Sequence, residues 1–239
     1  MEKIKKYTKD ESYSYALGAF PSIEAIKTIK EDIITVFIHS KYKDKDNLIN
    51  YLKKENISYS ISDKAINRLA KKGNTLVIAV FKKNLKEVTS ENHIVLEEVS
   101  NMGNLGTIIR TMLAMGIKDL VTIGNSCDIY DPKVIRASMG AIFKIRHKHF
   151  DNMKEYFDTY GENRDIYFFL LNEDAEKLND LSKNKNKNFS LVYGNEGSGL
   201  KDDYKEYGKS VFIPQTEDVD SLNLPISVAI GIYEFLIRS

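Results

Sequence analysis

The sequence lacks the residue patterns that several classes of protein require. It contains a single cysteine, Cys127, so it can form neither a disulfide framework nor a metal site built from several cysteines. No stretch approaches the roughly 18 consecutive apolar residues of a membrane span. The start of the chain, MEKIKKYTKDES, has no apolar core of the kind found in signal peptides. We therefore expect a cytoplasmic protein with no membrane segment.

The glycine-containing loops also lack the common nucleotide-binding patterns. The segment Gly194–Gly199 follows an apolar run, but it has neither the lysine of a phosphate-binding loop nor the spacing GxGxxG. Glu196, near its centre, would repel a phosphate and favours a ligand that is cationic or carries hydroxyl groups. ATP and NAD are therefore not expected. No cluster of His, Asp and Cys suggests a metal site, and no metal is expected either.

Charge is distributed unevenly along the 239 residues. Residues 1–86 contain 18 Lys and Arg against 10 Asp and Glu, whereas residues 87–239 contain 17 against 24. Such an asymmetry suggests that the first part meets a polyanion, although solvated surface lysines explain it equally well. The hydrophobic content of 42% suffices for two modest cores. We place a domain boundary at Lys86, between domains 1–86 and 87–239.

The first domain alternates strand and helix patterns and is predicted to be a small α/β sandwich. Residues 1–10 are interpreted as a polar, mobile lead-in, residues 14–29 as one helix with a proline near its start, and residues 33–38 as a buried strand. Lys71 and Lys72 form a basic turn before the last strand. This turn is a candidate contact for phosphate, and a plain helix-to-strand turn accounts for it equally well.

The second domain has a first cluster of candidate site residues around Asn104. We expect Asn104 to stand at the mouth of a helix over residues 107–115, with Arg110 six residues further on. A helix cap and a surface arginine would be the ordinary explanation. However, Gly103 and Gly106 flank Asn104 and allow a ligand to approach the backbone. Arg110 also has apolar neighbours in sequence, so we do not expect it to be freely solvated.

The C-terminal stretch predicts a strand, an acidic loop and a long helix. Ser221 stands where we expect the N-cap, and apolar residues then surround the predicted helix on nearly all sides. Such a helix is expected to pack against its own domain and against a second subunit. A core strand–turn–helix explains the apolar positions, but it does not explain the polar cluster that contains Ser221 and Asn223.

Two features of the middle of the chain give weaker signals. Arg136, in a predicted helix that begins at Pro132, is either an RNA contact or an ordinary helix-surface arginine. Residues 144–149, KIRHKH, form a basic tract. It is a candidate contact for a polyanion, but a solvated strand edge explains it at least as well. Cys127 has no feature nearby that would lower the pKa of its thiol, so it is expected to be inert.

Three segments now stand in order along the second domain. They are NMGNLGTIIRTMLAMGI, LVYGNEGSGL and IPQTEDVDSLNLPISVAIGIYEF. Together they closely resemble the three motifs of the SpoU (TrmH-like) family of RNA ribose methyltransferases, within the SPOUT superfamily, over roughly residues 92–239. The first eighty-six residues resemble the small ribosomal-protein-like domain that many members carry. One departure is Asn101-Met102, where many members have Asp-Pro, which leaves the local turn shape open.

The resemblance implies an α/β fold whose C-terminal part forms a deep trefoil knot and holds S-adenosylmethionine. It implies a homodimer that transfers a methyl group to a ribose 2′-hydroxyl of RNA, with ribosomal RNA favoured over tRNA. Alternatives are a catalytically silent RNA-binding or ribosome-assembly factor and, less favoured, a base methyltransferase. Housekeeping modification and antibiotic resistance are equally compatible with the sequence.

The resemblance also assigns residues by their positions in the motifs. The catalytic set would be Asn104, Arg110, Glu196, Ser221 and Asn223. Residues at the cofactor would be Gly194, Asn195, Gly199, Ile213 and Leu222, and RNA contacts would be Arg110, Arg136, Lys71 and Lys72. Arg110 would contact the phosphate beside the target ribose. Its guanidinium is an implausible free base, so either proton transfer to the phosphate or purely electrostatic help is expected.

Overall fold

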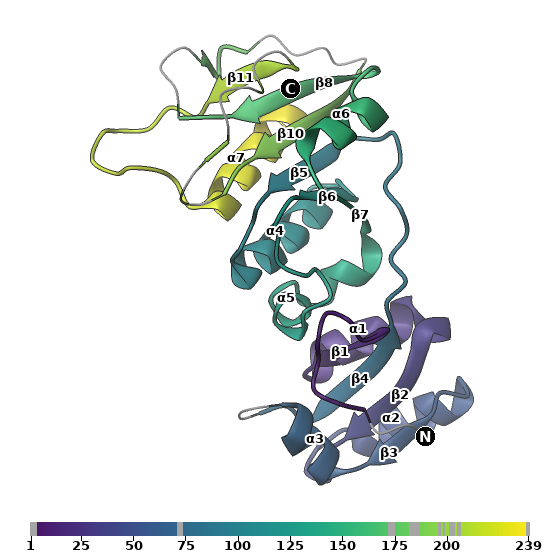
Figure 1. The fold of residues 1–239 in the computed structure, drawn as a ribbon. Helices are drawn as coiled ribbons and strands as arrows, with labels where there is room; N and C mark the ends of the chain where they lie inside the picture. Colours follow the sequence, from purple (N-terminus) through teal and green to yellow (C-terminus); the bar gives the residue numbers. More distant parts are fainter. Residues whose placement is uncertain are drawn as a thin grey trace. The chain divides into compact units, whose positions relative to one another are not determined.

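The chain forms two compact units in the computed structural model, which describes residues 4–70, 74–171, 175–181, 187–195, 197, 199–200, 204 and 207–237. Unit 1 comprises residues 1–84 and 128–144, and unit 2 comprises residues 85–127 and 145–239 (Figure 1). The chain therefore passes between the units three times.

Unit 1 contains a four-stranded sheet in the order β1-β4-β2-β3. β4 pairs antiparallel with β1 and β2, whereas β3 pairs parallel with β2. Its elements are β1 (Tyr13–Leu17), α1 (Ala19–Thr28), the 3-10 helix η1 (Lys30–Asp32), β2 (Ile33–Ile38), α2 (Lys45–Lys54), β3 (Tyr59–Ile61), α3 (Asp63–Leu69), β4 (Val77–Lys82), α5 (Pro132–Ala137) and the 3-10 helix η2 (Ala141–Lys144).

The start of unit 1 corrects two predictions. Residues 13–17 form β1 and not part of a helix, because Gly18, with φ 111°, separates the strand from α1. The lead-in is also held in place over residues 4–7. Tyr13 and Tyr15 accept hydrogen bonds from the backbone of this segment, and Arg68 donates one to the Ile4 carbonyl at 2.9 Å.

The segment 128–144 completes the packing of unit 1. α5 lies against β1, and η2 lies against α1. The Ser14 hydroxyl donates to the Tyr130 carbonyl at 2.6 Å, and the rings of Phe81 and Phe143 meet edge to face at 5.1 Å. Unit 1 is thus assembled from two stretches that lie far apart in sequence.

Unit 2 contains a seven-stranded, fully parallel sheet in the order β7-β6-β5-β10-β8-β11-β9. Its elements are β5 (His93–Glu97), α4 (Met102–Ala114), β6 (Asp119–Ile123), β7 (Arg146–Phe150), α6 (Met153–Tyr160), β8 (Arg164–Phe169), β9 (Glu176–Lys177), β10 (Asn188–Tyr193), β11 (Lys209–Phe212) and α7 (Leu224–Leu236). β5 and β6 are buried along their whole length, as expected for parallel strands covered on both faces.

Helices cover both faces of this sheet. Alternate residues of the central strands, including Val95, Val121 and Val192, join Phe157 of α6 in one apolar cluster. On the other side, α4 and α7 pack against each other, and α7 also lies against β10 (Figure 1). None of the described helices has the length and apolar character that a membrane crossing requires.

Tyr193 of β10 and Gly231 of α7 lie in close contact between the sheet and the helix. Tyr193 is fully buried and stacks on Phe169 at 4.4 Å, and burial raises the pKa of its hydroxyl well above the usual value. This hydroxyl has no hydrogen-bond partner among the described residues. A Cβ atom on Gly231 would lie 2.1 Å from it, so α7 can approach the sheet this closely only with glycine at this position.

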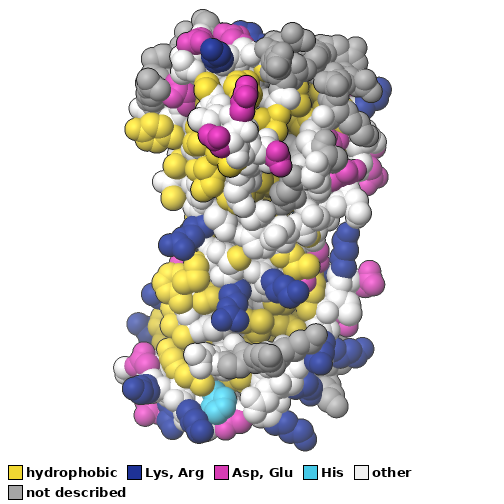
Figure 2. Space-filling model, turned by 90° about the vertical axis from the view of Figure 1, so that its left-hand side faces the viewer, with side chains coloured by type: hydrophobic (Ala, Val, Ile, Leu, Met, Phe, Trp, Pro, Cys, Tyr) yellow, Lys and Arg dark blue, Asp and Glu magenta, His cyan; other side chains and the backbone are white. Residues whose placement is uncertain are grey.

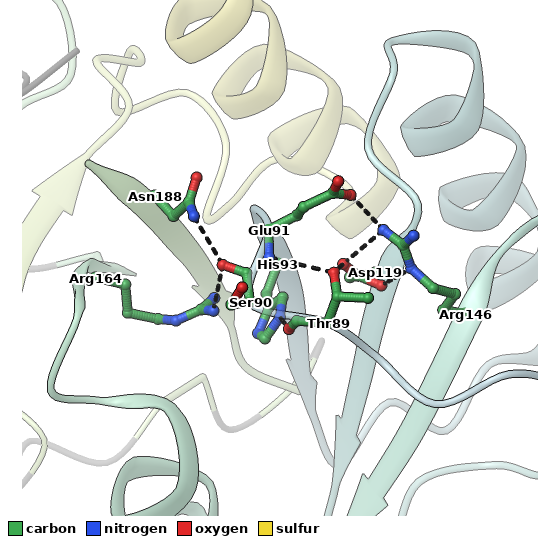
Figure 3. A network of polar contacts seen from close by, with 8 residues as sticks. All are labelled: Thr89, Ser90, Glu91, His93, Asp119, Arg146, Arg164 and Asn188. Atoms are coloured by element: carbon green, nitrogen blue, oxygen red, sulfur yellow. Dashed lines mark hydrogen bonds and ion pairs between the residues drawn. The ribbon is translucent and has the colours of Figure 1, made fainter. Parts of the chain in front are cut away.

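A buried polar network lies at the opposite edge of the sheet, where the strands begin (Figure 3). Asp119, the first residue of β6, is completely buried and is bonded by the Nε and NH2 groups of Arg146. The Thr89 hydroxyl donates to the same carboxylate at 2.7 Å. Glu91 adds a more exposed ion pair to Arg146. The start of β7 is thereby joined to that of β6.

The other half of the network centres on Arg164, which begins β8. Its guanidinium donates to the Tyr160 and Ser90 carbonyls and to the Ser190 hydroxyl, at 3.0–3.1 Å. Asn188, which begins β10, also donates to the Ser90 carbonyl. The loop before β5 is therefore tied to the starts of β8 and β10.

His93, the first residue of β5, connects the two halves. Its Nε2 lies 2.7 Å from the Thr89 carbonyl, which can only accept, so Nε2 carries the proton and Nδ1 accepts from Tyr156 at 2.9 Å. Tyr156 in turn contacts Ser190 at 2.6 Å. Burial, followed by the charge of Arg164, lowers the pKa of His93 to about 4, so the imidazole is neutral at pH 7.

Substitution at Gly231 should reveal how tightly α7 is packed. Gly231→Ala places a methyl group against the Tyr193 hydroxyl and should lower the free energy of unfolding by about 1–3 kcal/mol. Tyr193→Phe removes an unpaired buried hydroxyl and should leave stability unchanged or raise it. Urea denaturation of the double variant should then show a smaller loss than Gly231→Ala alone. Purely additive effects would contradict the contact.

The stability of the protein should fall in mild acid because of His93. Its pKa is lower in the folded chain, about 4, than in the unfolded chain, so the folded state binds fewer protons between these values. The stabilisation is therefore complete above about pH 6.5 and lost as pH falls to about 4, with a size of roughly 3 kcal/mol.

Urea midpoints at pH 7.5 and pH 5 would measure this loss. A His93→Gln variant should show a flatter profile over the same interval, because glutamine does not titrate. An equal decrease in the urea midpoint between pH 7.5 and pH 5 for the two proteins would exclude His93 as the cause.

Candidate active site

The strand order of unit 2 changes direction between β5 and β10. After β5 the chain builds β6 and β7 on one side of it, and then returns to build β8 and β10 on the other side. β10 pairs directly with β5. In open α/β sheets, ligands bind outside the carboxyl ends of the strands at such a switch point. The loops after β5 and β10 contain the first two motifs identified in the sequence.

α4, which contains most of the first motif, begins five residues earlier than the predicted helix over residues 107–115. α4 starts at Met102, and Asn101 is its N-cap: its side chain accepts from the backbone amides of Gly103 at 2.8 Å and Asn104 at 3.1 Å. α5 begins with the same arrangement at Asp131-Pro132. Asn101-Met102 therefore fills the roles of a capping residue and a first helical residue that Asp-Pro commonly fills.

The exposure of Arg110 corrects a prediction. Arg110 is exposed, whereas Ile108, Ile109 and Met112 are buried. Each residue turns the helix by about 100°, so residues that flank Arg110 in sequence face away from it. Asn104 is half-buried in the first turn of the same helix. α4 thus carries both residues, and its apolar stripe holds it against the core.

The second motif forms a tight loop directly after β10. A Cβ atom on Gly194 would lie 2.3 Å from the Gly199 carbonyl carbon, so the two ends of the loop meet backbone to backbone. The Gly199 amide donates to the Asn195 carbonyl at 3.0 Å. Gly199 has φ 67°, and the space beside it is open. Glu196, a predicted catalytic residue, lies outside the described residues.

The third motif follows β11. α7 begins at Leu224, with Asn223 as N-cap and Pro225 in its first turn, so the prediction of Ser221 as N-cap was wrong. The Asn223 carbonyl accepts the first helical bonds, while its side chain makes no capping bond. Ser221 and Asn223 are exposed, and Ile213 and Leu222 are half-buried. A proline in the first turn sets the helix start more strongly than a serine cap.

The structure brings some of the predicted site residues together. Asn104 and Arg110 of α4 and the loop from Gly194 to Gly199 all follow β5 and β10 at the switch point. α7, which begins after Asn223, packs against α4. Arg136 is exposed and belongs to unit 1. Lys71 and Lys72 lie outside the described residues.

Sequence reasoning missed the residues at the end of β5. Glu97 is buried and accepts a hydrogen bond from the Tyr204 hydroxyl at 2.5 Å. Glu98 is exposed and adopts a left-handed conformation with φ 52°. Nothing in the sequence signals a left-handed glutamate. Asn101, by contrast, could have been recognised as a cap, because it occupies the position of an aspartate in the resembling family.

The fold and the position of these loops define the class of the protein. It is an α/β protein with a parallel sheet, in which the polar residues of the three motifs stand on α4 and on the two loops after β10 and β11, at the carboxyl edge where such folds bind ligands. Residues 91–233 match the model of the SpoU rRNA Methylase family. This match covers more than half of the chain, which therefore belongs to that family.

Similar proteins include two bacterial enzymes named for ribosomal RNA. The chain is 28% identical over 149 residues to the 23S rRNA (adenosine(1067)-2'-O)-methyltransferase of Streptomyces azureus, which covers 61% of this chain and 54% of that protein. It is 28% identical over 150 residues to the 23S rRNA (guanosine(2553)-2'-O)-methyltransferase RlmP of Bacillus subtilis, covering 62% and 59%. The matches thus span little more than half the length of these relatives.

Solved structures show the same fold. The SpoU methyltransferase AviRb from Streptomyces viridochromogenes, in complex with the cofactor AdoMet, superimposes with a TM-score of 0.80 at 20% identity. The superposition covers 95% of this chain and 90% of that one. At this identity, the likeness establishes the α/β fold with its parallel sheet.

Proposed function

We propose that this protein is an S-adenosylmethionine-dependent methyltransferase that methylates a ribose 2′-hydroxyl of RNA, with ribosomal RNA as the favoured substrate. The observation that carries the proposal is the family match over residues 91–233, which contains the first two motifs and the third as far as Tyr233. The relatives named for 23S rRNA 2′-O-methylation support the substrate. A cytoplasmic location follows from such a substrate.

The residues at the carboxyl edge fit S-adenosylmethionine. The loop from Gly194 to Gly199 offers backbone without side chains at its glycines. The space beside Gly199, which a side chain at this position would fill, is open to a ligand. Half-buried Ile213 and Leu222 add apolar surface for an adenine ring. When bound, the cofactor supplies a methyl group that its sulfonium already activates.

The protein's own residues must then place the ribose hydroxyl and deal with its proton. Arg110, which is exposed on α4, would meet the RNA phosphate beside the target ribose. It would stabilise the charge that develops as the hydroxyl reacts. Alternatively, it would first transfer a proton to that phosphate and then, as a neutral guanidine, accept the proton of the ribose hydroxyl. Asn104 and Asn223 would orient the hydroxyl, Ser221 would bond the pocket, and Glu196 would hold the arginine or its own loop.

We further propose that the C-terminal part of unit 2 is knotted. Two features support this: β10 inserts between β5 and β8, and α7 returns to pack on α4, a helix that forms much earlier in the chain. An experimental structure of the S-adenosylmethionine complex would test it, and an unthreaded path for residues 194–236 would contradict it.

Unit 1 is proposed to bind the RNA. Its basic excess suits a phosphate backbone, and Figure 2 shows Lys and Arg side chains interspersed with hydrophobic ones on the face in view. The segment 128–144 brings exposed Arg136 into this unit. Lys71 and Lys72 are kept as proposed contacts. The fold of unit 1, a small sheet with helices, is proposed to be ribosomal-protein-like.

The exposed side of α7 is proposed to form the homodimer interface. Ile226, Tyr233 and Ile237 are 51%, 51% and 57% exposed, and Ile230 is half-buried. These residues follow one another at intervals of four, three and four, so they form one apolar stripe along the helix. The opposite side of α7 is buried within the unit, which leaves this stripe for a second copy.

Arg110 and Arg136 should separate chemistry from binding. Arg110→Ala should lower kcat for methyl transfer by about 100-fold or more while S-adenosylmethionine still binds, because it removes charge stabilisation at the reacting groups. Arg136→Ala should instead weaken RNA binding and reduce its salt dependence, with kcat at saturating RNA near normal. Methyl transfer from labelled S-adenosylmethionine to ribosomal RNA, with identification of the nucleosides, measures kcat for both variants. The same assay at several RNA and salt concentrations measures the change in RNA binding.

Lys118→Ala provides a control, since Lys118 is exposed and stands before β6 at the opposite edge of the sheet. Near-normal turnover of Arg110→Ala would exclude Arg110 from the mechanism. If the wild-type protein binds S-adenosylmethionine and RNA but methylates no RNA, the silent RNA-binding factor becomes the better explanation. Methylated bases in place of 2′-O-methylated nucleosides would indicate the base-modifying alternative.

Tyr233→Glu should disrupt the proposed dimer. A carboxylate in the middle of the apolar stripe would be costly to bury on association. Sedimentation should show a dimer for the wild type and a shift toward monomer for the variant, with far-UV circular dichroism unchanged. Glu162→Lys, an exposed charge change far from α7 in sequence, serves as control. An unchanged dimer in Tyr233→Glu would rule out this face.

A further inference from the structure

The side chain of Asn195 joins the loop of the second motif to the end of β5. Its Nδ2 donates to the Glu98 carbonyl at 2.8 Å, across 97 residues of sequence. Its Oδ1 accepts from the Gly197 amide at 2.8 Å. Both ends of the carboxamide are therefore engaged within the protein, one across the two loops and one inside its own loop.

This bond lies where the sheet itself stops joining the two strands. β10 and β5 pair in parallel up to Tyr193 and Leu96. β5 continues to pair with β6 through Glu97, and the Glu98 amide still donates to the Ile123 carbonyl at 3.0 Å. On the β10 side, the backbone hydrogen bonds end, and the Asn195 side chain makes the next bond between the two segments. This bond lies at the switch point between β5 and β10.

The acceptor of this bond belongs to a residue in an unfavourable conformation. Glu98 has φ 52°, a left-handed value that residues other than glycine rarely adopt. Its side chain lies beside Gly124, where an added Cβ would be 3.3 Å from Glu98 Cγ. Such strain persists only when surrounding contacts hold it. The bonds to Ile123 and Asn195 hold the two peptide groups on either side of the Glu98 Cα atom.

The two loops joined in this way contain residues with different proposed tasks. Three residues after Glu98 comes Asn101, the N-cap of α4, the helix that carries Asn104 and Arg110. The Asn195 loop contains the glycines proposed to meet the cofactor. A second bond, from Tyr204 to Glu97, ties the chain beyond this loop to the same strand end. A shift of the Glu98 turn would therefore change the distance between the two groups.

We propose that Asn195 is a positioning residue for methyl transfer. Its carboxamide sets the separation between the loop at the cofactor and the helix that carries Arg110, and it acts through the Glu98 turn without contacting the reacting atoms. This inference rests on the proposed function, and it replaces the role of cofactor contact that the resemblance implied for the Asn195 side chain.

Asn195→Asp and Asn195→Ser test the proposal together. Both keep an oxygen that can accept from the Gly197 amide. Asp has no hydrogen to donate to the Glu98 carbonyl, and the single short hydroxyl of Ser cannot replace the two ends of the carboxamide. Each should lower kcat by roughly 10- to 100-fold, because displacement of reacting groups by about 1 Å has effects of this size. The KM for RNA and the Kd for S-adenosylmethionine, measured by calorimetry, should change by no more than about threefold, since the binding groups remain in place.

Glu98→Gly should rescue the Asp variant. Glycine adopts the left-handed conformation without strain, so the turn no longer needs the bond from Asn195. The double variant Glu98→Gly/Asn195→Asp should recover kcat to within about fivefold of Glu98→Gly alone. Asn163→Asp, the same substitution at an exposed turn before β8, is the matched control and should leave kcat unchanged.

The outcomes separate this inference from the proposed function. A kcat within about twofold of wild type in both Asn195 variants would overturn the positioning role. A parallel loss of S-adenosylmethionine affinity would also overturn it, and would make Asn195 a cofactor ligand. If the wild type itself neither binds S-adenosylmethionine nor methylates RNA, the proposed function fails. Hydrogen exchange over residues 194–200 then still tests the bond: unchanged exchange in Asn195→Asp would refute it.

Discussion

The sheet of unit 2 depends on the buried network that joins the starts of its strands. His93, Asp119, Arg146, Arg164 and Asn188 are the first residues of β5, β6, β7, β8 and β10 respectively. A buried ion pair such as Asp119–Arg146 adds little net stability, but loss of one partner would cost about 3–5 kcal/mol. Its main effect is on register. A strand that slipped by one residue would separate these groups and expose its other face.

This constraint at one edge determines the geometry at the other. Because the strand starts are fixed, the length of each strand decides where its carboxyl end lies. β5 ends one residue beyond the last residue of β10, because Tyr193 pairs with Leu96, so the loops from Glu98 and from Gly194 begin close together. The two edges differ in chemistry: His93, Asp119 and Arg164 at the amino edge are buried and hydrogen-bonded, whereas Arg110, Ser221 and Asn223 at the carboxyl edge are exposed. An exposed polar group can exchange water for a ligand.

Much of the fold was predictable from the sequence, because it follows from local patterns. The β-branched run 33–38 forms β2, and the apolar run before Gly194 forms β10. The helix starting at Pro132 was also correct. The strand 13–17 was missed because Gly18 allows either a helix interruption or a strand end. The final helix was placed too early because Ser221 is a good cap by type, while Pro225 determines the start.

The candidate site was predictable only in part, for a different reason. Motifs locate Asn104, Arg110 and the glycine loop, since each is a contiguous stretch. The contacts that hold them are not contiguous: Asn195 and Glu98 are 97 residues apart, and Thr89 and Asp119 are 30 apart. One sequence contains no signal for such pairs. The left-handed conformation of Glu98 is likewise a consequence of its surroundings and not of its residue type.

The assembly of unit 1 from residues 1–84 and 128–144 has a consequence for how such proteins can diversify. A recombination event that exchanged only the first eighty-odd codons would import a sheet whose packing partner, α5 with η2, remained that of the recipient. The contacts of Tyr130 with Ser14 and of Phe143 with Phe81 would then be replaced by contacts with residues of the imported sheet. Gene fusion at a single junction is therefore an unfavourable route to new specificity here. Substitutions accumulated on both stretches in step would preserve the shared core.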